Sequence, residues 1–127
     1  MDTLADALNA MKVGERSGKA SVMLRPASKV IKRVLEILKE EGYVEGFSFI
    51  DDGLSGKLSV QLEGKINECR VVKPRFAVKN TDWEKWEGRF LPAKDTGVLI
   101  VSTSKGIMTH SKAKNEKLGG RLLAYIY

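Results

Sequence analysis

Hydrophobic residues recur at helical spacing in the first third of the chain. They share one face of a first helix, which we expect Thr3 to cap and Gly14 to end. A second helix is predicted to open at Ser28 or Pro26 and to end at a Gly42 C-terminal cap. The apolar stripes are Leu4, Ala7, Leu8 and Met11 in the first helix and Val30, Ile31, Val34, Leu35 and Leu38 in the second.

Alternation of apolar and polar residues predicts strands around these helices. Clear runs occupy residues 20–24 and 58–62, and shorter ones lie near 47–49 and 71–72. Between them, Asp-Asp-Gly at residues 51–53 is typical of a turn with glycine in the left-handed conformation.

An aromatic helix is predicted early in the second half of the chain. Thr81 and Glu84 have the spacing of a capping box, and Trp83, Trp86 and Phe90 follow on one face. This spacing favours burial of the rings in a core, and base stacking against RNA is the alternative.

Two strands complete the pattern. Residues 97–101 are continuously apolar, which predicts a buried strand, and residues 121–127 form another. Between them we expect a short helix that is capped by Thr109 and runs to Gly119.

A break near Pro74 separates the elements into two groups. We therefore predict the α+β class, with two small domains packed together and short helices against mixed or antiparallel sheets. The N-terminal domain would span residues 1–73 and the C-terminal domain residues 74–127.

Composition narrows the class of protein. The chain has 127 residues, of which 43% are hydrophobic and 30% charged, and this is typical of a globular protein rather than a disordered one. It has no apolar run long enough to span a membrane and no signal-peptide pattern, so we expect a cytoplasmic protein without a membrane partner. The chain has one cysteine, Cys69, which excludes an internal disulfide. It also has one histidine, His110, so a Cys/His zinc cluster cannot form, and no metal or cofactor is expected. We expect Cys69 to be buried and His110 to make local hydrogen bonds.

The net charge of +6 is unevenly distributed along the chain. Residues 1–33 carry a net charge of +4, residues 34–69 carry −5 and residues 70–127 carry +7. A segregated basic surface attracts polyanions, so the sequence pI near 9.5 permits a nucleic-acid partner without requiring one.

A hydroxyl-rich loop follows the buried strand of the second half. Its residues are Ser102, Thr103, Ser104, Lys105 and Gly106. Hydroxyls donate and accept hydrogen bonds, so they can recognise phosphates, ribose and base edges. The alternative is a turn whose hydroxyls bond its own backbone.

Two enzyme motifs are matched only in part. Ser102 and Lys105 have the Ser-x-x-Lys spacing of penicillin-recognising enzymes, which makes a small serine-dependent hydrolase an alternative, although the companion motifs are missing. Residues 53–58 resemble a shortened phosphate-binding loop with Leu58 in place of the hydroxyl that meets magnesium, and we predict a hairpin turn there. A protein–protein adaptor with an incidental basic surface is a further alternative.

Several segments together form a family pattern. The longest is residues 101–109, VSTSKGIMT, and the others are residues 2–6, 26–29, 38–43 and 118–121. On these segments the chain resembles the family of the universal small-subunit ribosomal protein numbered eight. Residues 83–94 and 123–127 are most similar to its archaeal–eukaryotic branch, in particular to archaeal members.

This resemblance implies a structural ribosomal component and not an enzyme. Such a protein binds the central domain of small-subunit ribosomal RNA directly, helps to assemble the platform, and has other small-subunit ribosomal proteins as neighbours. Some members of the family also repress their own operon by binding its messenger RNA. The implied RNA-binding residues are Ser102, Thr103, Ser104, Lys105, Gly106 and Thr109, together with Thr3, Asn9, Ser28, Lys29 and Lys32 in the N-terminal domain. We expect the acidic residues 45–68 to face away from the RNA.

Overall fold

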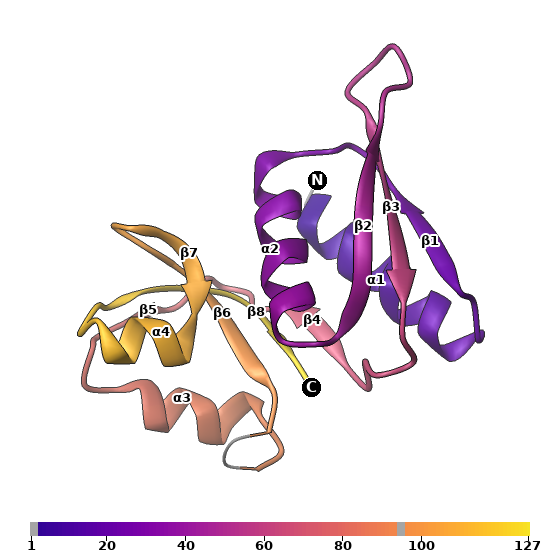
Figure 1. Cartoon of the computed structure of the whole chain (residues 1–127). Coiled ribbons are helices and arrows are strands. Elements are labelled where there is room, and N and C mark those ends of the chain that lie inside the picture. Colours follow the sequence, from indigo (N-terminus) through magenta and orange to yellow (C-terminus); the bar gives the residue numbers. More distant parts are fainter. Residues whose placement is uncertain (1–2, 94–95) are drawn as a thin grey trace. The chain divides into compact units, whose positions relative to one another are not determined.

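A computed structural model of the chain describes residues 3–93 and 96–127 (Figure 1). Two compact units make up the chain, Met1–Asn67 and Glu68–Tyr127. Helices and antiparallel sheets occur in both, which confirms the α+β class. The elements of the first unit are α1 (Thr3–Arg16), β1 (Ser21–Leu24), α2 (Lys29–Glu40), β2 (Val44–Ile50) and β3 (Lys57–Leu62). Those of the second are β4 (Cys69–Val71), β5 (Ala77–Val78), α3 (Trp83–Phe90), β6 (Val98–Thr103), β7 (Gly106–Thr109), α4 (His110–Asn115) and β8 (Gly120–Ile126).

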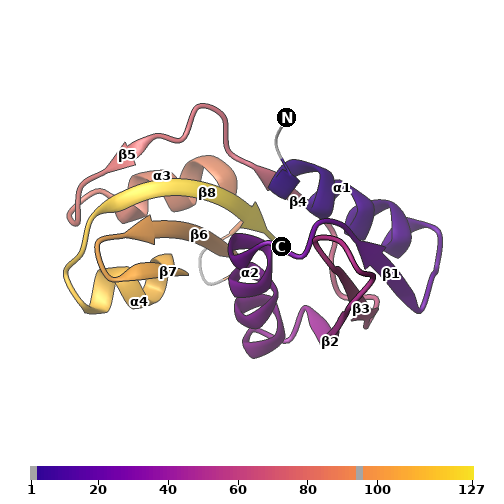
Figure 2. The ribbon, with the colours of Figure 1, turned by 90° about the horizontal axis from the view of Figure 1, so that it is seen from above.

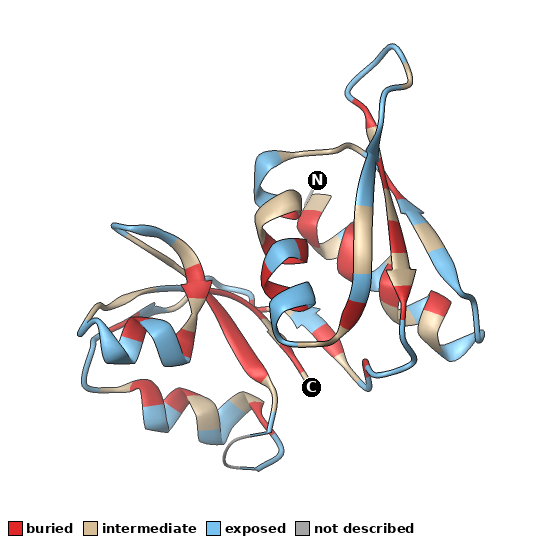
Figure 3. Cartoon of the chain, in the orientation of Figure 1, coloured by how far each residue is buried: buried red, intermediate tan, exposed pale blue. Residues whose placement is uncertain are grey.

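The first unit is a three-stranded antiparallel sheet in the order β1-β3-β2, with α1 and α2 packed on it. Buried Leu58, Val60 and Leu62 alternate with less buried residues along the central strand β3 (Figure 3). One face of the sheet therefore forms the core with the two helices, as strict alternation predicts.

Helix α1 is longer than the sequence predicts, because Gly14 does not end it. The helix continues to Arg16, and Gly14 is buried. A Cβ at this glycine would overlap the side chain of Val22 on β1. The glycine is thus a site of close helix–strand packing, and the chain turns at Gly18, whose φ is +72°.

Helix α2 begins and ends where the sequence predicts. The Ser28 hydroxyl accepts a hydrogen bond from the Ile31 amide at 3.1 Å, and Gly42 has a φ of +82° just after the helix. One member of the expected apolar stripe differs, because Val30 is 40% exposed.

The second unit contains a five-stranded antiparallel sheet. Its main path is β4-β8-β6-β7, and β5 pairs with β8. Figure 2 shows this sheet from above, with β8 curving beside β6. The core includes Trp83, which is 1% exposed, and Trp86, so the prediction that the tryptophans pack in a core is confirmed. Cys69 is also buried, as expected.

The boundary between the units differs from the predicted one after residue 73. Strand β4 pairs with β8, with Cys69 opposite Ile126 and Val71 opposite Ala124. This long-range pairing places residues 68–73 in the second unit.

The start of α3 and the end of α4 also differ from the expectation. Helix α3 begins at Trp83 after an Asp82 that makes no side-chain capping bond, so the predicted Thr81 cap is wrong. Helix α4 ends at Asn115 rather than at Gly119, and Lys117 beyond it has a φ of 56°. Asp2 and Lys94, which belong to the family segments, lie outside the described residues.

Candidate nucleic-acid interface

The hydroxyl-rich loop is the tip of a tight hairpin between β6 and β7. Thr103 pairs with Gly106, which leaves Ser104 and Lys105 as a two-residue turn. Gly106 has a φ of 110°, a conformation that glycine adopts without strain. The loop is therefore held by two strands, one of which is buried at the centre of the sheet.

The Thr103 hydroxyl is used inside the hairpin. It donates to the Gly106 carbonyl oxygen at 2.9 Å and accepts from the Lys105 amide at 3.1 Å. For this residue the alternative of a turn that satisfies its own backbone holds. Its bonds brace the turn.

The two serines of the loop are different. Ser102 is half-buried and Ser104 is exposed, and their hydroxyls have no hydrogen-bond partner within residues 3–93 and 96–127. Each can therefore donate and accept toward a ligand without first breaking a bond inside the protein.

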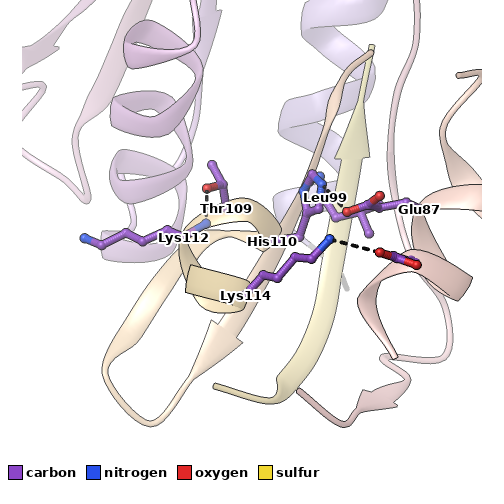
Figure 4. Close-up of polar contacts among 7 residues, drawn as sticks. Glu87, Leu99, Thr109, His110, Lys112 and Lys114 are labelled. Carbon is purple, nitrogen blue, oxygen red and sulfur yellow. Dashed lines mark hydrogen bonds and ion pairs between the residues drawn. The ribbon is translucent and has the colours of Figure 1, made fainter. Parts of the chain in front are cut away.

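Thr109 is the N-cap of α4, as the sequence predicts. Its hydroxyl accepts from the Lys112 amide at 3.2 Å (Figure 4). The cap joins the end of β7 to the helix, so Thr109 supports the hairpin while its hydroxyl is occupied. Lys105, at the turn, is exposed.

His110 lies directly after this cap and is buried, with 5% of its surface exposed. Its Nδ1 accepts from the Leu99 amide at 3.0 Å, and its Nε2 lies 3.1 Å from a Glu87 carboxylate oxygen. Figure 4 shows the ring between these two partners. Burial lowers the pKa of His110, and the Glu87 carboxylate opposes that shift. The residue makes local hydrogen bonds, as expected, and ties α4 to β6 and α3.

The five candidate residues of the N-terminal domain all lie in the first unit. Ser28, Lys29 and Lys32 come together over the first turn of α2, where the Ser28 hydroxyl is occupied by the cap. The Lys32 ammonium lies 4.6 Å from the centre of the Phe49 ring, whereas Lys29 is exposed. Thr3 is half-buried at the first described residue of α1, and Asn9 is exposed further along this helix.

The strand β7 and the partners of His110 are not predicted from the sequence. The sequence does contain one signal for the strand, because Gly106 is followed by an alternation in which Met108 alone is buried. No signal in the sequence identifies Leu99 and Glu87 as the partners of the imidazole, since they belong to two other elements.

The described residues form neither a metal-binding cluster nor a membrane-spanning helix. Among residues 3–93 and 96–127, no group of three or more His, Cys, Asp or Glu side chains could hold a metal ion. None of the helices in this part of the chain has the length and apolar character needed to cross a membrane.

Comparison with protein families assigns the chain. The family described as Ribosomal protein S8 matches residues 2–127. Members of this family are structural proteins of the small ribosomal subunit in the cytoplasm and not enzymes, which rules out the serine-dependent hydrolase. They bind ribosomal RNA beside other ribosomal proteins. With this match over nearly its whole length, the chain belongs to the ribosomal protein S8 family.

Proposed function

We propose that this protein binds the central domain of small-subunit ribosomal RNA directly and helps to assemble the platform, with the β6–β7 hairpin as its main contact. The observation that carries the proposal is the division of hydroxyls in the hairpin. Thr103 braces the turn, while the hydroxyls of Ser102 and Ser104 have no partner in the part of the chain that the structure describes. A rigid turn with unpaired donors and acceptors suits recognition of an irregular RNA helix through its minor groove.

In this mechanism the serines provide the selectivity for the RNA, and the lysines position the protein on the RNA backbone. The Ser104 hydroxyl at the tip contacts a base edge or a ribose hydroxyl, and Ser102 contacts the same groove. Lys105 approaches a phosphate as a mobile point charge, and Gly106 lets the backbone come close to the RNA. Thr103 and Thr109 hold the geometry from inside the protein.

The first unit contributes phosphate contacts in this proposal. Lys29 and Lys32 project from the start of α2, which Ser28 holds through its cap. Thr3 and Asn9 on α1 contribute polar contacts. Such contacts position a protein on RNA without reading its sequence.

We also propose three finer assignments. The aromatic segment of α3 and the residues 123–127 support an archaeal-type branch of the family. The same hairpin would let the protein bind a messenger-RNA copy of its ribosomal site and repress its own operon. The acidic segment of residues 45–68 would then face basic ribosomal neighbours rather than RNA.

A filter-binding titration of the protein with central-domain ribosomal RNA tests the hairpin. Loss of one hydrogen bond corresponds to about 1 kcal/mol, so Ser104→Ala should weaken binding about fivefold. Ser48→Ala is the matched control, because Ser48 is an exposed serine on β2. Equal affinities of the two variants, or equal binding of the unmodified protein to an unrelated RNA hairpin, would contradict the proposal.

Autoregulation has its own test. A transcript of the protein's operon should compete with central-domain RNA for the unmodified protein, and Ser104→Ala should weaken both complexes by the same factor. A transcript that competes no better than an unrelated RNA would exclude a messenger-RNA site.

A further inference from the structure

An unbroken row of five aromatic rings crosses the second unit beside α3 and β8. Neighbouring ring centres are separated by 4.9 to 6.2 Å, and four of the five residues are half-buried, so the row is partly accessible to solvent. In order, the rings of this aromatic row belong to Phe76, Trp86, Phe90, Tyr125 and Tyr127.

Cationic side chains follow the aromatic row. The Arg89 guanidinium lies 4.8 Å from the centre of the Phe76 ring and 5.2 Å from that of Trp86, and the Lys85 ammonium lies 5.5 Å from Trp86. A third cation, Arg75, precedes Phe76 in the chain, and all three are exposed. Within residues 3–93 and 96–127 none of the three pairs with a carboxylate.

The far end of the row has a different charge pattern. Arg70 is opposite Tyr125 in the β4–β8 pairing, and its Nε lies 3.9 Å from a Glu68 carboxylate oxygen. The Arg70 side chain is nevertheless 62% exposed. Glu68 is 19% exposed, so the cation is the more accessible member of this pair.

From this arrangement we infer a second RNA-binding surface, formed by the aromatic row and by Arg75, Lys85 and Arg89. It lies toward the β4–β8 side of the sheet, whereas the hairpin is at the opposite edge, at β7. The inference goes beyond the proposed hairpin contact and shares with it only the ribosomal RNA as ligand.

Unpaired RNA fits this surface better than an acidic protein segment does. A guanidinium over aromatic rings presents its other side to solvent, where it can stack on a base while its N–H groups meet a phosphate. The solvent-accessible parts of the half-buried rings beside these cations offer further stacking to bases without a demand on their sequence. An acidic peptide would use the charges and leave the row without a partner.

Charge reversal tests the surface in the full-length protein. We expect Arg75→Glu combined with Lys85→Glu to weaken binding to full-length small-subunit ribosomal RNA at least about tenfold and to reduce the salt dependence of log K by about 1.5, as the loss of two phosphate contacts predicts. The control is Lys19→Glu combined with Lys39→Glu, which changes the net charge equally at two exposed lysines of the first unit. Equal affinity and salt dependence in the two double variants would overturn the inference.

Two further measurements keep the test decisive. Arg75→Gln combined with Lys85→Gln serves if the reversed variant melts early, and it should lose the same two contacts. In Trp83→Phe protein, the fluorescence of Trp86 should change when this RNA is added, because Lys85 and Arg89 lie over its ring and would engage the RNA, and an unchanged spectrum would count against the surface. If the charge variants bind RNA as their control does but lose a ribosomal protein from a reconstituted subunit, the surface is a protein contact and the inference is wrong.

The design separates this surface from the hairpin. Ser104→Ala removes a neutral hydrogen bond, so it should leave the salt dependence unchanged, whereas charge reversal along the row should lower it. If one of these two results is not obtained, only the proposal that it tests is contradicted.

Discussion

The imidazole of His110 should be one of the largest single polar contributions to the stability of the second unit. It accepts from the Leu99 amide at 3.0 Å and lies 3.1 Å from Glu87, and Leu99 has no exposed surface. In His110→Ala the Leu99 N–H would be left buried without an acceptor, which costs about 1 to 3 kcal/mol. With the cavity left by the ring, we expect a total loss of roughly 3 kcal/mol.

Chemical denaturation at neutral pH measures this loss in the free energy of unfolding. His110→Asn should recover most of it, because the Asn carbonyl can accept from Leu99 as Nδ1 does. Ser111→Ala, next in the chain and exposed, is the control and should stay within about 0.5 kcal/mol of the unmodified protein. A loss below about 1 kcal/mol in His110→Ala, or no recovery in His110→Asn, would refute the assignment of these two bonds.

The same residue predicts a pH dependence. Burial lowers the pKa of His110 below the ordinary value of 6.5, so the unfolded chain binds its proton more readily than the folded one. Its contribution to stability is complete above 6.5 and is lost as the pH falls from there through the lowered pKa. Geometry explains the direction, since a proton on Nδ1 would point at the Leu99 N–H. The advantage of the unmodified protein over His110→Asn should shrink on acidification, and a constant difference between about pH 7.5 and about pH 5 would contradict this.

Three further substitutions test single contacts. Ser28→Ala removes the cap on the Ile31 amide and should lower stability by about 1 kcal/mol in thermal melting, where no change would show that the cap is unimportant. Gly120→Ala places a Cβ against the Ser102 carbonyl oxygen, so we expect a loss of about 1 to 3 kcal/mol and weaker RNA binding in a filter assay; unchanged binding would separate this packing from the hairpin's function. Thr103→Val keeps the shape but removes both hydroxyl bonds, so amide exchange at the turn should accelerate, and unchanged exchange would show that the hydroxyl does not brace it.

The features that the sequence predicts well are those determined by neighbouring residues. Ser28 and Thr109 cap their helices, and Gly42 and Gly53 have positive φ angles of 82° and 77°. A cap or a turn needs a hydroxyl or a glycine within three or four residues of the group that it serves. The sequence contains that information directly.

Features that depend on distant partners are the ones that the sequence does not predict. Gly14 has the sequence pattern of a helix end, and only the packing of Val22 against it explains why the helix continues. The same holds for β4, which belongs to the second unit because of its pairing with β8. At Thr81 the capping-box pattern predicts an N-cap, but the N-cap is Asp82, so the helix begins one residue later than the pattern predicts.

For the candidate site, the sequence identifies the residue types but does not show which of their hydroxyls are already hydrogen-bonded inside the protein. The turn of Ser104 and Lys105 lacks the Asn-Gly or Gly-X pair that usually marks a two-residue hairpin, so the strand β7 is not predicted. Without the hairpin, the pairing of Thr103 with Gly106 cannot be predicted. It then also cannot be predicted which hydroxyls form hydrogen bonds inside the protein.

The division between threonine and serine in this segment has a physical reason. Threonine is β-branched and restricted at χ1, so a hydroxyl that must stay hydrogen-bonded to a particular backbone group loses little freedom there. Both threonines, Thr103 and Thr109, hold such internal bonds. Ser102 and Ser104 lack the extra methyl group, and their hydroxyls can rotate toward a ligand whose shape is imposed by the RNA. A segment with four serines would lose the brace, and one with four threonines would present bulkier, stiffer hydroxyls to the groove. Serine and threonine are both neutral, so this difference does not contribute to the net charge of +6. The selectivity proposed for the hairpin therefore depends on neutral groups, while the charged side chains position the protein on the RNA and determine the salt dependence of binding.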